Sequence, residues 1–264
     1  MRRLITIPIS HYCEKARWAL DRAGLHYREE RHLQMLHWPH AWAAGGGRTV
    51  PVLVADGQSY PESADILRYA DAQLDEASRL YPAGIASAVA ELEHEFDADF
   101  GVESRRIFYA LLSLPGGRAL LAINAHGAPR WEAALLWLSF PVARGMLSRY
   151  LGVSPATVQR AKDRVSRTLD DVAERLRDGR PYLFGERFTA ADLAFAALSA
   201  PLSLPSNYGI PLPTRAVAKA HDPNAGQFWE HPAVAFALRM YATQREATTM
   251  GQQDPAGSEP PGTQ

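Results

Sequence analysis

Strand-forming patterns are confined to the first eighty residues of the sequence, and this confinement limits the folds open to the chain. Residues 4–7, Leu-Ile-Thr-Ile, favour a strand, and residues 10–23 place apolar side chains on one helical face before Gly24. Beyond Glu76 the apolar residues follow helical spacing only. This order predicts a small domain of strands and helices followed by an all-helical domain.

The sheet of the first domain is expected to be mixed. Residues 25–30 can form a second strand, and residues 49–54, Thr-Val-Pro-Val-Leu-Val, predict a third. Asp56-Gly57 is typical of a tight hairpin turn and leads into residues 58–60, so part of the sheet is antiparallel. Residues 32–44 between these strands have no clear pattern and are expected to be a connection.

We therefore expect an α/β domain over residues 1–77, an all-helical domain over residues 85–246 and a disordered tail over residues 247–264. The tail is rich in Gly, Pro, Ser, Thr and Gln and has no apolar periodicity. Helices of the second domain are expected over residues 85–100, 103–114, 131–138, 154–178, 189–200 and 232–243.

Charge and cysteine content narrow the partners and the compartment. The chain has 28 Lys and Arg against 29 Asp and Glu, a formal net charge of −1, so we expect no nucleic acid and no membrane as partners. A single cysteine excludes an intramolecular disulfide and fits a reducing compartment, so we expect a cytoplasmic protein. No apolar run has the length and composition of a targeting or membrane-spanning segment.

Ser10 and Cys13 lie where a strand ends and a helix begins. The first amides of a helix lack internal partners and the helix dipole is positive there, so an anion such as a thiolate is stabilised at this point. The alternative is that Ser10 is a simple helix cap and Cys13 a small packed side chain. The residues alone leave both interpretations open.

Four stretches in order resemble the cytosolic glutathione transferase family. Ser10 to Leu20 resembles the first active-site stretch of the family, Thr49 to Leu53 its cis-proline loop, and Pro61 to Leu67 its stretch that binds a glutathione carboxylate. Thr189 and Asp192, which form a capping box ahead of an apolar helix, match a signature of the second domain. The resemblance implies a thioredoxin-like first domain with an all-helical second domain.

The resemblance also implies that glutathione is the co-substrate and that the hydroxyl of Ser10 donates a hydrogen bond to its sulfur. A cis bond between Val50 and Pro51 would expose the backbone of Val50, which would pair with the cysteinyl part of glutathione. The alternative for these two residues is a proline that simply starts an edge strand.

The ends of glutathione have their own candidate residues. The resemblance implies that the hydroxyl and amide of Ser63 hold the γ-glutamyl carboxylate, and that Glu62 receives the ammonium group. Arg48, beside a glycine run, is a candidate for the glycine carboxylate. The alternative for Glu62 and Ser63 is an ordinary helix start. The alternative for Arg48 is a charged loop residue that only contacts solvent.

The leading hypothesis is a homodimeric glutathione transferase of detoxification, which joins glutathione to a small hydrophobic electrophile. Phe108, Tyr109, Trp131 and Trp137 are candidates for the apolar pocket, or for core positions. A non-catalytic ligand-binding or scaffold protein and a thiol reductase that depends on Cys13 are the rival hypotheses.

No metal site is assigned by the sequence. Three histidines, His32, His37 and His40, lie close together, but no cysteine or carboxylate pattern accompanies them.

Overall fold

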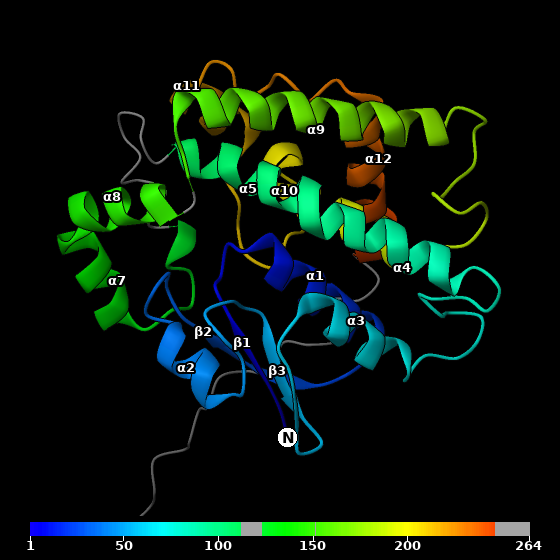
Figure 1. Ribbon diagram of the computed structural model, residues 1–264, viewed down its shortest axis with the longest axis horizontal. Helices are drawn as coiled ribbons and strands as arrows, with labels where there is room; N and C mark the ends of the chain where they lie inside the picture. Colours follow the sequence, from blue (N-terminus) through cyan, green and yellow to red (C-terminus); the bar gives the residue numbers. More distant parts are fainter. Residues whose placement is uncertain (112–122, 151, 246–264) are drawn as a thin grey trace, which may run out of the picture.

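The computed structural model describes residues 1–111, 123–150 and 152–245, and it consists of a small α/β domain under a layer of helices (Figure 1). The α/β domain has the order βαβαββα. Its elements are β1 (Arg2–Thr6), α1 (His11–Arg22), β2 (Tyr27–Arg31), α2 (Trp38–Ala43), β3 (Val52–Ala55), β4 (Gln58–Tyr60) and α3 (Ser63–Asp71).

The four strands form one mixed sheet in the order β2-β1-β3-β4. β1 runs parallel to β2 and antiparallel to β3, and β3 pairs with β4 across a hairpin. Asp56 and Gly57 have φ of 53° and 77° in this turn, which is the region that Gly and Asp tolerate best. The expected mixed sheet is confirmed.

Alternation along β1 gives the sheet two buried faces. Leu4 belongs to the main hydrophobic core with α1 and α3, whereas its neighbour Ile5 packs with Ala41 and Ala44 at α2. Figure 1 shows α1 and α3 on one side of the sheet and α2 on the other. α1 therefore lies between the sheet and the helical layer.

Beyond the α/β domain the described residues are helical. The elements are α4 (Ala86–Glu95), the π-helical turn η1 (Phe96–Phe100), α5 (Gly101–Ala110), α7 (Arg130–Leu138), α8 (Phe140–Tyr150), α9 (Pro155–Arg175), α10 (Ala190–Ser203), α11 (Arg215–His221), α12 (Pro232–Met240) and the π-helical turn η4 (Tyr241–Arg245).

α10 is the central helix of this layer. Nearly all of its side chains are buried, and it packs against α1, α4, α5 and α12. The expected capping box starts it, because the backbone amide and the hydroxyl of Thr189 both donate to one carboxylate oxygen of Asp192. The other oxygen of Asp192 accepts from the amide of Leu183, which fixes the loop ahead of the helix.

Buried ion pairs join α1 to the helical layer. The ammonium group of Lys15 lies 2.7 Å from a carboxylate oxygen of Glu93 and 2.5 Å from one of Asp97. Arg245, at the end of η4, pairs with Glu14 and Asp21 from the other side of α1. These contacts hold α1 in a fixed position against α4, η1 and η4.

The structure differs from the sequence expectation at three helices. α2 lies inside residues 32–44, which we expected to be a connection, and α8 and α11 were not expected. The domain limits at residues 77 and 85 stay a prediction, and the expected tail, residues 247–264, lies outside the described residues. Of the helices that the structure describes, none combines the length and the apolar character needed to cross a membrane.

Candidate active site

Ser10 caps α1 at the carboxyl end of β1. Its backbone is extended, with φ −69° and ψ 122°, and its Oγ accepts a hydrogen bond of 3.4 Å from the backbone amide of Cys13. The side chain is half-buried, and its hydroxyl hydrogen has no oxygen or nitrogen acceptor among the described residues. The hydroxyl can therefore donate to a ligand placed at the positive end of the α1 dipole.

A cavity of about 210 Å³ opens beside Ser10, between the α/β domain and the helical layer. Three of the expected site residues, Ser10, Arg48 and Val50, line it, whereas Pro51, Glu62 and Ser63 do not. Apolar and aromatic side chains from the helical part of the chain also line it, among them Phe108, Tyr109, Met146, Tyr150, Pro201, Leu204, Tyr208 and Leu212. The cavity therefore has a polar wall beside Ser10 and an apolar wall from the helices.

The peptide bond between Val50 and Pro51 is cis, as the resemblance implied. The ladder between β3 and β1 starts at Val52, so Val50 precedes the sheet pairing. Neither backbone polar group of Val50 has a hydrogen-bond partner among the described residues. An extended peptide in the cavity can reach both groups.

Glu62 and Ser63 begin α3, as expected, with Glu62 in the extended conformation of a helix cap. Ser63 is 5% exposed, and its Oγ has no hydrogen bond to the residues that the structure describes. Partial burial and the charges of Asp65 and Asp97 raise the pKa of Glu62. α3 packs against α1, and burial, with a smaller contribution from the charge of Glu62, raises the pKa of Tyr12 in the first turn of α1.

Arg48 lies over an aromatic ring at the cavity wall. Its guanidinium carbon is 5.3 Å from the ring centre of Trp38, the first residue of α2, and both residues line the cavity. The backbone carbonyl of Arg48 is 3.0 Å from Nε2 of His37, which ties this loop to α2. Arg48 therefore presents a cation beside the polar wall.

A second cation of the cavity, Arg105 of α5, was missed by the sequence analysis. Its guanidinium carbon lies 5.8 Å from the ring centre of Tyr12, and no ion pair of Arg105 occurs among the described residues. Of the residues that the structure describes, no Asp or Glu lines the cavity. The site is therefore electropositive. Arg105 is 95 positions from Ser10, which explains why no local motif indicated it.

Of the four aromatic residues that were candidates for the pocket, two line the cavity and two do not. Phe108 and Tyr109 line the cavity, and burial raises the pKa of the Tyr109 hydroxyl. Trp131 and Trp137 do not line it, and both are more than half exposed on α7. The expectation was therefore right for the α5 residues and wrong for the two tryptophans, because spacing shows which side chains share a face but not what that face contacts.

The only cysteine is held away from solvent. Cys13 is fully buried, and burial raises the pKa of its thiol to about 11, although Arg17 and the hydrogen bond with Ser10 act in the opposite direction. A thiol with this pKa is protonated at neutral pH and is a poor nucleophile. Of the two interpretations left open by the sequence, the structure favours a packing role for Cys13.

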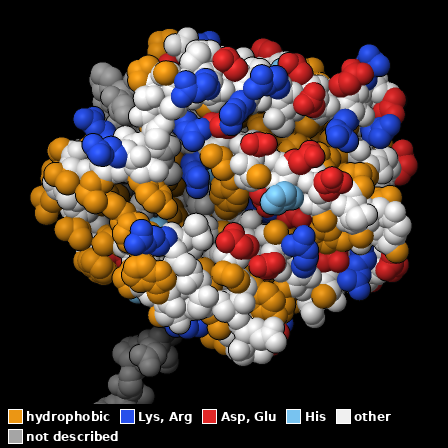
Figure 2. All heavy atoms as spheres, in the orientation of Figure 1, with side chains coloured by type: hydrophobic (Ala, Val, Ile, Leu, Met, Phe, Trp, Pro, Cys, Tyr) orange, Lys and Arg blue, Asp and Glu red, His pale blue; other side chains and the backbone are white. Residues whose placement is uncertain are grey.

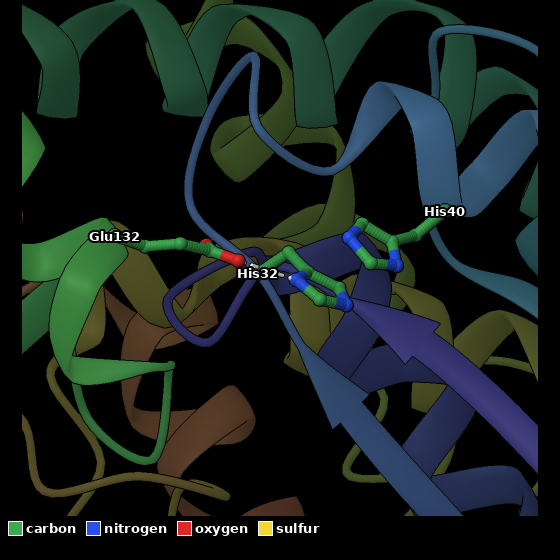
Figure 3. A group of neighbouring side chains, drawn as sticks. All are labelled: His32, His40 and Glu132. Atoms are coloured by element: carbon green, nitrogen blue, oxygen red, sulfur yellow. Dashed lines mark hydrogen bonds and ion pairs between the residues drawn. The ribbon is translucent and has the colours of Figure 1, made fainter.

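The histidines do not gather in a single loop. His32 follows β2 and His40 lies in α2, and their rings stack with centres 3.6 Å apart. Figure 3 shows that α7 brings Glu132 to this pair, a carboxylate that sequence spacing gave no reason to expect. Potential ligand atoms of the three residues lie within 4.8 Å of one another.

Hydrogen bonding explains this group without a metal. One oxygen of Glu132 lies 2.7 Å from Nδ1 of His32, and the other accepts from the backbone amide of Leu33 at 2.8 Å. Imidazole lone pairs lie in the ring plane, so stacked rings do not aim them at one point. We interpret the group as the polar anchor of α7, and the absence of a metal stays a prediction.

Family models match both parts of the chain. Residues 4–78 match the model described as the glutathione S-transferase N-terminal domain, and residues 155–200 match the model described as the glutathione S-transferase C-terminal domain. A search of curated proteins found no match at the significance required.

Solved structures share the fold over nearly the whole chain. The beta-etherase LigF from Sphingobium sp. strain SYK-6 is 16% identical with a TM-score of 0.62, and the alignment covers 95% of this chain and 99% of that one. A glutathione S-transferase from Rhodospirillum rubrum F11 is 19% identical with a TM-score of 0.58, over 97% and 94% of the chains. The glutathione-bound theta class enzyme from Xanthomonas axonopodis pv. citri is 17% identical with a TM-score of 0.55, over 94% and 96%.

The fold is therefore that of a two-domain protein with a thioredoxin-like first domain and an all-helical second domain. With both of its domain models matched in order, the chain belongs to the glutathione S-transferase family.

Proposed function

We propose that the chain is a glutathione transferase in which Ser10 activates the thiol of bound glutathione. A thiol with a pKa of about 8.5 is only ~3% ionised at pH 7, and lowering this pKa by ~2 units makes the thiolate the main form. Such a shift requires the site to stabilise the thiolate over the thiol by about 2.7 kcal/mol of free energy. A hydrogen bond to a charged group stabilises by roughly 1.5–3 kcal/mol, and the helix dipole adds to it. The position of the Ser10 hydroxyl, at the start of α1 and beside the cavity, is the observation that carries this proposal.

Other residues would hold glutathione in an extended conformation. The backbone of Val50, just before the cis bond to Pro51, would pair with the cysteinyl residue. Ser63 and the first amides of α3 would bind the γ-glutamyl carboxylate, and Glu62 would receive the ammonium group. Arg48 would bind the glycine carboxylate.

The second substrate would lie on the apolar wall, against Phe108 and Tyr109. The thiolate sulfur would form a bond to an electrophilic carbon, and the electron pair displaced from that carbon would leave with the departing group or move onto the substrate. Arg105 would stabilise the negative charge that develops there, because none of the described residues that line the cavity is acidic and could compete for it. The substrate class is therefore a small apolar electrophile. Cytoplasmic location, homodimer formation and a role in detoxification stay predictions.

Turnover on a panel of electrophiles tests the proposal. Conjugates of glutathione would be measured by mass spectrometry for the parent protein, for Ser10→Ala and for Ser10→Thr, which keeps the hydroxyl. We expect Ser10→Ala to lose about 10–100-fold in kcat/KM and Ser10→Thr to retain most of it. Tight glutathione binding with no conjugation of any electrophile would instead favour a ligand-binding protein.

A further inference from the structure

An apolar surface faces solvent on the hairpin of α7 and α8. Among the described residues, seven of the ten large hydrophobic side chains that are exposed lie between positions 131 and 150. Figure 2 shows hydrophobic side chains gathered over this part of the molecule, at the left of the view. We call this surface the α7–α8 face, and it consists of Trp131, Leu135, Leu138, Val142, Met146 and Tyr150.

The α7–α8 face follows helical periodicity, which separates it from scattered exposed hydrophobics. On α7 its members are spaced by four and three residues, and on α8 by four and four, so each helix presents one apolar stripe. The six side chains are between 46% and 72% exposed. Monomeric proteins seldom leave a contiguous apolar surface of this kind without a partner.

The exposed charged side chains of the α7–α8 hairpin, Arg130, Arg144 and Arg149, have one sign, and they belong to a longer basic segment. Between Glu103 and Asp163 the sequence has eight Arg and Lys but a single acidic residue, Glu132. Glu132 is fully buried and bonded to His32, so it contributes no charge to the surface (Figure 3). Arg144 and Arg149 of α8 are exposed. The net charge of −1 is therefore unevenly distributed: this segment is basic, and the rest of the chain is acidic.

The inner sides of both helices are already occupied. Leu136 of α7 and Ala143 of α8 pack with Leu33, next to the Glu132 anchor, and form a separate small core. The α7 stripe lies on the opposite side of its helix from Leu136, and the α8 stripe stays exposed beside Ala143, so this small core does not bury them. An external surface is needed to cover the α7–α8 face.

We propose that the α7–α8 face docks on an anionic lipid surface. Amphipathic helices of this kind lie in the interface plane, with Trp and Leu in the acyl region and basic side chains on the headgroups. Trp131 and Tyr150 belong to the residue types that are enriched at this depth. Arg144 and Arg149 supply attraction for anionic headgroups. This inference departs from the sequence expectation of no membrane partner, which rested on the charge of the whole chain.

Charge also argues against self-association through this face. A twofold dimer brings the same patch together on both copies, so Arg144 and Arg149 of two copies would meet without an acidic partner among the described residues of the hairpin. Like charges in such an arrangement oppose pairing. An anionic lipid surface has the complementary sign.

The α7–α8 face lies next to the cavity, so lipid docking would affect how a substrate reaches the proposed active site. Met146 and Tyr150 belong to the α7–α8 face and also line the cavity beside Ser10. Docking would therefore place the cavity next to the acyl region, where an apolar electrophile concentrates. This consequence rests on the proposed function, but lipid docking itself does not.

Vesicle sedimentation with the full chain tests the docking. The probes are vesicles of phosphatidylcholine alone and vesicles with phosphatidylglycerol added. We expect binding to the anionic vesicles, weakened by salt, and binding about tenfold weaker for the double variant Leu138→Glu with Val142→Glu. Val217→Glu is the matched control, because Val217 is 59% exposed on α11, and we expect it to bind as the parent does. Because the side chains of Leu138, Val142 and Val217 face solvent, we expect the variants to fold. Circular dichroism checks that they do.

Tryptophan fluorescence provides a second measurement that does not depend on these variants. Bromine-labelled lipid is expected to quench the tryptophan fluorescence of the parent protein. The substitution Trp131→Phe is expected to remove most of that quenching. Equal binding of the parent and the double variant, or no binding to anionic vesicles at low salt, would overturn the proposal. Self-association in analytical ultracentrifugation that the double variant abolishes, without vesicle binding by the parent, would assign the face to a second copy and overturn it too. Glutathione turnover in solution, measured on the same variants, reports separately on the proposed function.

Discussion

The Oγ atom of Ser10 lies 3.4 Å from the backbone amide of Cys13, so the serine hydroxyl accepts a weak capping bond, and its hydrogen has no oxygen or nitrogen acceptor among the described residues. The same arrangement buries the thiol of Cys13 one turn into α1. Two residues three positions apart therefore have different roles: Ser10 faces the cavity, and Cys13 packs in the interior.

Cys13→Ala is predicted to leave glutathione conjugation nearly unchanged. Burial raises the pKa of the thiol to about 11, so the thiolate is scarce at neutral pH. In the folded parent protein we expect slow alkylation by a thiol reagent, becoming fast on addition of denaturant. Loss of all activity in Cys13→Ala, with the fold retained, would revive the thiol reductase hypothesis.

Arg105→Met is predicted to lower kcat more than it changes the affinity for glutathione. The guanidinium would act on charge that develops during the reaction, and such an interaction contributes about 1.5–3 kcal/mol, or roughly 10–100-fold in rate. Arg167→Met, an exposed change on α9, is the matched control. A rise in KM with an unchanged kcat would mean that Arg105 acts only in binding.

Acid is predicted to destabilise the protein partly through His11. Burial, then the charge of Arg105, lowers the pKa of His11 from 6.5 to about 3, while its Nε2 lies 2.9 Å from the carbonyl of Gly101. Between these pH values the unfolded chain binds a proton that the folded chain does not. Stability therefore falls as the pH drops from 6.5 toward 3, by up to about 1.4 kcal/mol per unit.

His11→Gln provides the comparison, because the amide can still donate a hydrogen bond to Gly101 but does not titrate. Urea unfolding at a series of pH values is expected to show a shallower acid dependence for this variant. Parallel pH profiles for the two proteins would contradict the assignment to His11.

Lys15→Met is predicted to destabilise the fold by about 3–5 kcal/mol, because it leaves the carboxylates of Glu93 and Asp97 without their cation. Arg177→Ala removes an exposed pair with Glu174 and is expected to cost at most about 1 kcal/mol. Urea unfolding measures both. A cost for Lys15→Met no larger than that for Arg177→Ala would show that the buried pairs do not hold α1 in place.

The parts of the fold that the sequence predicted depend on local interactions. The cap at Ser10, the hairpin at Asp56 and Gly57, and the capping box of Thr189 with Asp192 each involve residues within three positions of one another. Their geometry follows from the residue types, so a single sequence reveals them.

The parts that were missed depend on contacts between distant segments or on short elements. Glu132 meets His32 across 100 positions, and no local pattern predicts such a pair. α2 has six residues, too few to show a helical period, and starts with Trp38 and a proline. α8 was missed although Val142 and its stripe have helical spacing, because the flanking residues include Pro141 and Gly145.

Proton release on glutathione binding tests the central claim most directly. Calorimetric titration near pH 7, in buffers with different ionisation enthalpies, counts the protons that leave when the thiol becomes a thiolate. We predict close to one proton released per glutathione for the parent protein, and little or none for Ser10→Ala at matched occupancy. Equal proton release by the two proteins would contradict activation of the thiol by Ser10.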